Sequence, residues 1–189
     1  FYIDENGVRR EVAAEDIGYV LSTPTVPEFL TGREFLKFFM DINEKSIKNP
    51  KSIDEYFDYM SIELEDRDKL LKDYSHGMKN KMQMLINIIA QPNILLLDEP
   101  FSALDYQTRL NVCDDVYNII RSEQKTAVLV THDISEAISV ADRVLVLSAR
   151  PARVLCSHAL EFGSTVPLRR RESPRFSGWF ELLWKELNV

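Results

Sequence analysis

The chain has 189 residues, of which 45% are hydrophobic and 28% are charged, with 30 acidic and 23 basic side chains. This length predicts one domain, whose core needs no disulfide framework and no structural metal. The formal charge of −7 argues against broad, charge-driven binding to nucleic acid or to acidic membranes.

Cysteine content and the chain start give the first expectations about location. The two cysteines, Cys113 and Cys156, are too few for a disulfide framework and favour a reducing compartment. No segment has the ~20 consecutive apolar residues that span a bilayer. The chain begins at Phe1 without an initiator Met or an apolar leader. We therefore expect a soluble, cytoplasmic chain that need not be a complete natural product.

The first predicted elements are a strand, a loop and a capped helix. The apolar run from Ile17 to Leu21 indicates a buried strand, and the proline-containing segment from Ser22 to Pro27 indicates a loop. Thr31 and Glu34 have the spacing of a capping box, in which each side chain bonds a backbone N–H at the helix start. The sequence therefore predicts a helix that begins here.

A helical region continues beyond this first helix. Ser52 and Glu55 repeat the capping-box spacing, and aromatic side chains between residues 35 and 59 predict a shared core. We expect the charged segment from Glu63 to Leu71 to form a short exposed helix. The segment from Gly77 to Ala90 starts polar and becomes apolar, which predicts a helix with a buried second half.

Strands and helices alternate in the second half of the chain. Two apolar runs, 94–97 and 127–130, indicate parallel strands covered on both faces. The remaining elements are expected at these positions: helices at 107–122 and 133–141, and a hairpin of strands at 143–147 and 152–156. This alternation is the layout of an α/β fold.

The tail after Phe162 has a different character. Its basic cluster, Arg169 to Arg171, is expected to lie on a solvated face. Trp179 and Trp184 follow at helical spacing, and we expect them to pack the last helix rather than to bind a ligand.

Two adjacent carboxylates, Asp98 and Glu99, follow the strand at 94–97. In open α/β sheets, ligands bind outside the carboxyl ends of the strands. Adjacent side chains at a strand end point in different directions, so one carboxylate can hold Mg²⁺ while the other orients and deprotonates a water. The alternative is an acidic turn without a ligand.

Three further segments carry polar groups suited to phosphate. His132 ends the next strand, so its imidazole is expected at the same sheet edge, where it can contact a developing phosphate charge. Asp105 closes a short segment after the acidic pair; the alternative for it is a helix cap. Ser75 and Gly77 stand where a helix begins, a position that favours anions, although an ordinary cap is again the alternative.

These segments, in this order, resemble the ATP-binding cassette (ABC) ATPases. Residues 95–99 look like the Walker B strand with its glutamate, 102–105 like the D-loop, and His132 like the switch histidine. Residues 74–78 look like a variant of the signature sequence Leu-Ser-Gly-Gly-Gln. The resemblance extends from the start of the chain to about Leu160.

The resemblance implies a fold and a domain organisation. The expected fold is α/β and P-loop-NTPase-like, with a mostly parallel sheet and an inserted helical subdomain at about 31–90. The ABC ATPase domain would occupy residues 1–160, N-terminally incomplete, and residues 161–189 would form an extension with a helix.

The resemblance also implies ATP and Mg²⁺ as ligands and a role for each motif residue. Asp98 would serve Mg²⁺, Glu99 would polarise the attacking water, and His132 would contact the γ-phosphate. Asp105 would couple the two sites of a dimer. The signature residues Ser75, His76 and Gly77 would bind the γ-phosphate held by the opposite subunit.

Two departures from the family pattern affect these expectations. The phosphate-binding sequence G-x-x-x-x-G-K-[ST] is not among these 189 residues, so we expect this chain alone to hydrolyse ATP negligibly. Ser22 stands at the Q-loop position, where the family has glutamine, so the usual amide contact to metal and water is in doubt.

The implied role is that of the energy-coupling ATPase of a membrane transporter. Its partners would be a transmembrane permease subunit and a second ABC ATPase, without nucleic acid, at the inner face of the cell membrane. The part up to Ala90 resembles export-type members, and residues 101–154 resemble importers of nitrate, sulfonate or taurine. Two alternatives remain: an ABC protein that acts on nucleic acid, and a catalytically silent module that lends its signature face to a partner or docks a membrane protein.

Overall fold

The computed structural model describes residues 2–3, 7–44, 47, 50–163 and 165–188. Its strands are β1 (Tyr2–Ile3), β2 (Arg9–Arg10), β3 (Ile17–Leu21), β4 (Ile94–Asp98), β5 (Thr126–Val130), β6 (Arg143–Leu147) and β7 (Val154–Ala159). Its α-helices are α1 (Gly32–Asn43), α2 (Ile53–Tyr59), α3 (His76–Ala90), α4 (Tyr106–Ser122), α5 (Ile134–Val140), α6 (Pro167–Arg171) and α7 (Pro174–Leu187). Short 3₁₀ turns lie at Ala14–Asp16 and Leu71–Asp73.

The central sheet is parallel and has the strand order β3-β4-β5. Its register aligns Leu21 with Asp98 and Asp98 with Val130, so the three strands end at one edge. The strands predicted at 17–21, 94–97 and 127–130 are therefore confirmed. These segments form strands because each strand can bury the apolar side chains of one face against the neighbouring helices.

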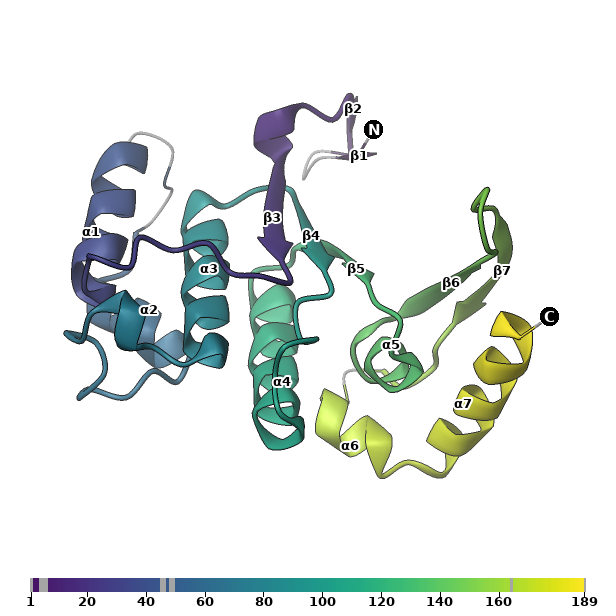
Figure 1. Cartoon of the computed structure of the whole chain (residues 1–189). Coiled ribbons are helices and arrows are strands. Elements are labelled where there is room, and N and C mark those ends of the chain that lie inside the picture. Colours follow the sequence, from purple (N-terminus) through teal and green to yellow (C-terminus); the bar gives the residue numbers. More distant parts are fainter. Residues whose placement is uncertain (1, 4–6, 45–46, 48–49, 164, 189) are drawn as a thin grey trace.

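The residues that the structure describes cover only one face of this sheet, so the prediction of strands buried on both faces is wrong. Helices α3 and α4 lie on that face, where Val20, Leu95 and Leu97 are buried (Figure 1). On the opposite face, Tyr19 is 50% exposed and Val128 47% exposed. An apolar run alone cannot tell whether its neighbours cover one face or two, because that depends on segments far away in the chain.

Both predicted capping boxes form. The Thr31 side chain accepts from the Glu34 backbone N–H, and the Glu34 carboxylate accepts from the Thr31 N–H at 2.9 Å. Ser52 and Glu55 make the same reciprocal pair at the start of α2. Each pair satisfies two backbone donors that a helix start leaves unpaired, which explains why these helices begin where the sequence predicts.

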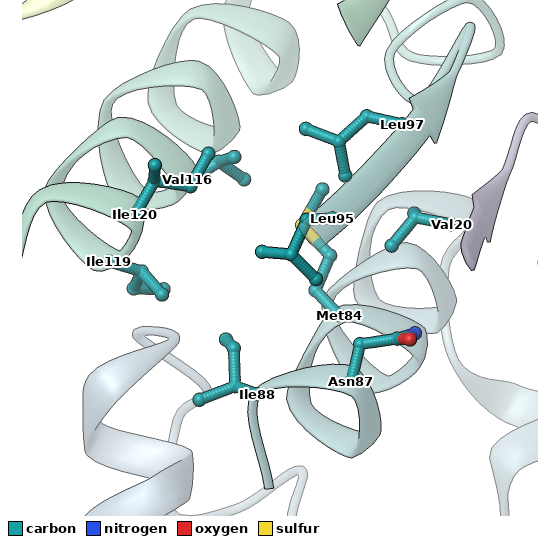
Figure 2. Close-up of a pocket in the computed structure, with 9 residues that line it drawn as sticks. All are labelled: Val20, Met84, Asn87, Ile88, Leu95, Leu97, Val116, Ile119 and Ile120. Carbon is teal, nitrogen blue, oxygen red and sulfur yellow. The ribbon is translucent and has the colours of Figure 1, made fainter. Parts of the chain in front are cut away.

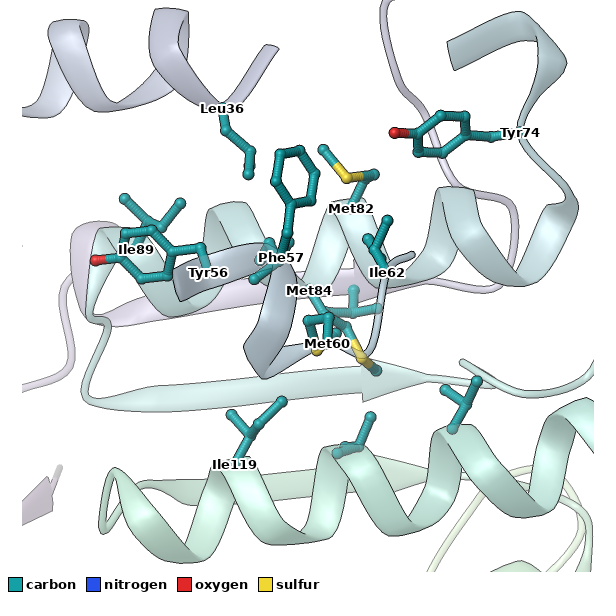
Figure 3. Packing of buried hydrophobic residues seen from close by; sticks show 14 of the residues in the cluster. Leu36, Tyr56, Phe57, Met60, Ile62, Tyr74, Met82, Met84, Ile89 and Ile119 are labelled. Atoms are coloured by element: carbon teal, nitrogen blue, oxygen red, sulfur yellow. The ribbon is translucent and has the colours of Figure 1, made fainter. Parts of the chain in front are cut away.

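Helices α1, α2 and α3 share one hydrophobic core with the sheet. Phe35, Tyr56 and Phe57 are buried in it, next to Met82 and other apolar residues of α3 (Figure 3). This confirms the core expected from the aromatic residues, apart from Phe38, which is exposed.

The short helix predicted at 63–71 does not form. The segment is a series of turns, such as the one in which the Asp66 N–H bonds the Glu63 carbonyl, and it ends in a 3₁₀ turn. Arg67 is buried, and its guanidinium donates to the Ile62 carbonyl and to the carboxylates of Asp54 and Asp58. A buried arginine needs several acceptors, and these tertiary bonds fix an irregular backbone.

The C-terminal half has a second core. The antiparallel hairpin β6–β7, turned at residues 149–151 as predicted, packs with α5 and α7 around Ile138, Val146 and Leu183. This core contains residues from both sides of position 160. Trp179 packs against it, whereas Trp184 is exposed and stacks on Phe180.

The basic cluster in α6 corrects another expectation. Arg170 is fully buried instead of solvated; its guanidinium donates to the carbonyls of Ala141 and Thr165 and to the Tyr117 hydroxyl. These bonds tie α6 to α4 and to the end of α5, and they satisfy a charge that would otherwise be costly to bury. None of the described helices combines the length and the apolar character needed to cross a bilayer.

Candidate active site

The predicted acidic pair lies at the carboxyl edge of the central sheet. Asp98 is the last residue of β4 and is exposed to solvent. Glu99 follows, and its backbone N–H donates to the Val130 carbonyl at 2.9 Å, which extends the pairing of β4 with β5. The two carboxylates therefore leave the sheet at one point, as the strand pattern predicted.

Glu99 has an unusual backbone. Its φ of +48° lies in the left-handed region, which a non-glycine residue rarely adopts. Ser102 stabilises the turn that follows, because its hydroxyl and its N–H both donate to the Glu99 carbonyl. Such a conformation costs of order 1–3 kcal/mol and persists where the surroundings hold it.

Glu99 and His132 are in direct contact. One carboxylate oxygen, Oε1, lies 2.7 Å from His132 Nδ1 and accepts the His132 backbone N–H at 2.9 Å. The second oxygen, Oε2, accepts no hydrogen bond from the part of the chain that the structure describes. The carboxylate is thus held by one oxygen and can offer the other to a water.

The contact also sets the electrostatics of the imidazole. The hydrogen bond that His132 donates to Glu99, followed by the charge of Glu99, raises the pKa of His132 above the ordinary histidine value. The His132 side chain is 82% exposed, whereas that of Glu99 is 24% exposed. The His132 ring is therefore exposed to solvent, and the less exposed Glu99 carboxylate holds the ring by a hydrogen bond.

A second set of side chains orients the His132 segment. The Thr131 hydroxyl donates to the Glu136 carboxylate at 2.8 Å, and Glu136 is buried, which raises its pKa. Arg109 of α4 contacts Asp133 at 3.3 Å and Glu136 at 3.4 Å, and donates to the Leu104 carbonyl at 3.0 Å. Arg109 thus joins the segment after Glu99 to the segment after His132. Sequence reasoning missed it because no motif marks an arginine in the first turns of a polar helix.

Asp105 is the N-cap of α4. Its carboxylate accepts from the Thr108 backbone N–H at 3.0 Å, and the interaction with Thr108 lowers the pKa of Asp105. Within this single chain, the structure shows Asp105 as a helix cap, which is the alternative that the sequence left open.

The signature-like residues begin α3. Ser75 is its N-cap and accepts from the Met78 N–H at 3.2 Å; Ser75 and His76 are exposed. Gly77 is buried, and a Cβ built on it would lie 2.9 Å from Thr108 Cγ2 and 3.4 Å from Leu104 Cδ2. Glycine is therefore needed here for close packing of α3 on the segment after the acidic pair.

Asn80 provides a second link between α3 and this turn. It is fully buried, and its amide Nδ2 donates to the Pro100 carbonyl at 3.0 Å. The bond holds the residue directly after Glu99. Sequence reasoning missed Asn80, because an asparagine between Lys79 and Lys81 in the polar first turns of a predicted helix gives no sign of burial.

Ser22, at the Q-loop position, directly follows β3. Its carbonyl oxygen lies 3.4 Å from His76 Nε2. The structure therefore links this position to the signature-like segment of the same chain.

A small cavity between the helices and the sheet is not a candidate ligand site. It is lined by apolar residues of β3, β4, α3 and α4, and by Asn87, whose amide already donates to the Tyr19 and Gln83 carbonyls (Figure 2). The lining offers nothing that would bind a phosphate. The polar groups suited to a nucleotide are at the sheet edge, where the oxygens of Asp98 match the ligands that Mg²⁺ prefers.

Comparison with known proteins identifies relatives along the whole chain. A family model described as ABC transporter matches residues 3–102. The chain is 40% identical over 122 residues to the uncharacterized ABC transporter ATP-binding protein YtlC of Bacillus subtilis (strain 168), covering 64% of this chain and 47% of YtlC. It is 31% identical over 190 residues to the aliphatic sulfonates import ATP-binding protein SsuB of Bacillus licheniformis, covering 99% of this chain and 71% of SsuB. The chain thus spans about half the length of YtlC.

Solved structures share the fold. A dimeric post-hydrolysis state of the ATP-binding cassette MJ0796, bound to ADP and Pi, matches with a TM-score of 0.61 and 21% identity, over 77% of this chain and 63% of that one. An ATP-binding subunit of an ABC transporter matches with a TM-score of 0.61 and 18% identity, over 93% and 69%. The predicted α/β, P-loop-NTPase-like fold is therefore confirmed, and the chain belongs to the ABC transporter family.

Proposed function

We propose that this chain is the ATP-binding, ATP-hydrolysing part of an energy-coupling subunit of an ABC membrane transporter. The observation that carries the proposal is the Glu99–His132 contact beside Asp98, at the carboxyl edge of a parallel sheet. That edge is where α/β proteins bind ligands, and the three groups suit metal binding, water activation and phosphate contact.

The geometry supports a separate task for each residue. Asp98, exposed at the end of β4, would hold Mg²⁺, which neutralises phosphate charge when it is bound. Glu99 would orient the attacking water through Oε2 and accept its proton, while Oε1 keeps its bonds to His132. His132 would contact the γ-phosphate, and its raised pKa favours the cationic form that stabilises developing negative charge.

A second ABC ATPase subunit would complete the site. Ser75 and His76 are exposed at the start of α3, where unpaired N–H groups favour an anion, so they and Gly77 would receive the γ-phosphate held by the opposite subunit. Asp105 caps α4 next to this segment and would couple the two sites. Gly77 and Asn80 support this coupling because they pack the signature-like segment on the turn after Glu99.

The transmembrane partner would dock beside the helical region. Phe29, in the loop between β3 and α1, is 79% exposed, and Phe38 of α1 is also exposed. These two aromatic side chains are the proposed contacts of the permease subunit. The similarity to SsuB, a sulfonate import protein by its name, favours import over export. We place the assembled subunit at the inner face of the cell membrane.

ATP turnover tests the proposal. Since these 189 residues contain no G-x-x-x-x-G-K-[ST] sequence, the assay joins them to the phosphate-loop segment of an ABC relative. Glu99→Gln removes the proton acceptor and is expected to lower kcat by about 10²-fold or more. Glu63→Gln, an exposed change of the same type, is the matched control and should retain full turnover. Equal turnover in the two variants would contradict the role of Glu99, and loss through Ser75→Ala alone would favour the silent module.

A further inference from the structure

A cluster of three potential metal ligands lies on the C-terminal core, away from the sheet edge. Cys156 and His158 alternate along β7, so their side chains leave the same face of the strand. Helix α7 lies beside the β6–β7 hairpin (Figure 1), and Glu186 is in its last turn. The Glu186 carboxylate lies 2.9 Å from Cys156 Sγ and 2.9 Å and 3.0 Å from His158 Nε2 through its two oxygens.

The three groups are close enough to share one ion. Their ligand atoms all lie within 4.8 Å of one another, and all three residues are half-buried. The Trp179 ring lies 5.7 Å from the His158 ring at a tilt of 59°, which limits the rotation of the imidazole. The site is therefore partly preorganised by the second core, and one side of it is open to solvent.

A nucleophilic thiol is the main alternative for this arrangement, and the geometry argues against it. In an activated cysteine, the imidazole lies between the thiol and the carboxylate and accepts the thiol proton. Here the carboxylate lies between the other two groups, and the thiol donates to it.

We propose that Cys156, His158 and Glu186 bind Zn²⁺, with water as the fourth ligand. Zn²⁺ takes sulfur, imidazole nitrogen and carboxylate oxygen at about 2.0–2.3 Å in tetrahedral geometry, which separates neighbouring ligand atoms by about 3.3–3.6 Å. The present hydrogen-bonded distances need to widen by only about half an ångström. The S–Zn bond forms as the thiol proton leaves to solvent, so the metal replaces the proton that Cys156 now shares with Glu186.

The ligand types also separate this site from the nucleotide site. Thiolate and imidazole favour Zn²⁺ over Mg²⁺, whereas Asp98 and Glu99 offer only oxygen. A metal held here would join β7 to the last turn of α7. Its role would be to fasten the C-terminal helix to the β6–β7 hairpin, independently of ATP chemistry.

Cobalt binding to the tag-free 189-residue chain tests the site. Co²⁺ in the place of Zn²⁺ should give a thiolate-to-metal charge-transfer band and the visible bands of a tetrahedral ion, and Zn²⁺ should displace it. Cys156→Ser should remove the charge-transfer band, and His158→Gln and Glu186→Gln should each weaken binding at least 10-fold. Glu181→Gln, an exposed change of the same type on α7, should leave binding unchanged.

The spectrum of the unsubstituted chain keeps the test independent of how the variants fold. The chain has two cysteines, and the other, Cys113, is buried in the first core with a pKa raised by burial to about 12. A charge-transfer band that survives Cys113→Ala therefore supports the site at Cys156. Absence of the band in the unsubstituted chain, or Zn²⁺ binding that is lost with His132→Gln and retained in Cys156→Ser, would overturn the proposal.

Discussion

The contact between Glu99 and His132 is the residue-scale feature on which the functional account depends. A single carboxylate oxygen accepts from both the backbone and the ring of His132, across the ends of two parallel strands. The left-handed conformation of Glu99 is held by the bond from its own N–H to Val130 and by the Ser102 bonds to its carbonyl. The local fold therefore maintains an unfavourable backbone where the proposed chemistry needs it.

The pKa of His132 gives a direct check of this contact. Because Glu99 favours the protonated imidazole, the interaction stabilises the folded chain at pH below the ordinary histidine pKa. That stabilisation is lost as the pH rises through the higher pKa of the folded state. In Glu99→Gln, an NMR titration of the His132 ring should show the pKa falling towards its ordinary value. An unchanged titration would mean that the contact does not form in solution, and Glu63→Gln serves as the control.

Substitution of Asn80 measures how much this residue stabilises the turn after Glu99. Asn80→Ala removes the donor to the Pro100 carbonyl inside the core, and an unsatisfied buried group costs about 1–3 kcal/mol. Urea unfolding should show this loss of stability. The ATP turnover of the loop-completed protein, in which the phosphate-loop segment of an ABC relative is joined to this chain, should also fall because Pro100 follows Glu99. Asn111→Ala, at an exposed position of α4, should stay within about 0.5 kcal/mol of the unsubstituted chain.

At the scale of elements, local patterns predicted most of the structure. The strands ending at Leu21, Asp98 and Val130 and the capped starts of α1 and α2 follow from short-range apolar runs and cap residues. The predictions are wrong where residues distant in the sequence determine the local structure or the burial of a side chain. The turns around Arg67 depend on Asp54 and Asp58, and the burial of Arg170 depends on Tyr117 and Ala141. No local pattern shows which arginine finds enough acceptors to be buried.

Arg67 should therefore contribute more to the stability of the fold than its position in a charged segment indicates. Arg67→Ala removes a buried guanidinium that bonds the Ile62 carbonyl and the Asp54 carboxylate, and we expect a loss of about 2–3 kcal/mol in the free energy of unfolding. Arg33 also pairs with Asp54, but more of its side chain is exposed, so Arg33→Ala should cost about 1 kcal/mol or less. Equal losses in urea unfolding would show that the Arg67 contacts do not hold this segment.

At the scale of the whole molecule, the described residues form two cores, each with its own cluster of polar groups. The first core holds the sheet and the helical region, and the candidate active site lies at the sheet edge. The second core holds α5, the β6–β7 hairpin and α7, with the proposed metal site on its surface. The sequence predicted that Asp98, Glu99 and His132 lie at one edge of the sheet, because each ends or directly follows an apolar strand. It did not predict Arg109, Asn80 or the second cluster, since these depend on which elements meet in space.

ATP-dependent dimerisation tests the central claim that the sheet edge hydrolyses ATP held between two subunits. If Glu99 acts on the water and not on binding, the loop-completed Glu99→Gln variant should bind ATP, close and fail to reopen. Analytical ultracentrifugation should then show a stable dimer with Mg²⁺ and ATP, a monomer with ADP, and no persistent dimer for the unsubstituted protein with ATP. A Glu99→Gln variant that stays monomeric with ATP would contradict the account.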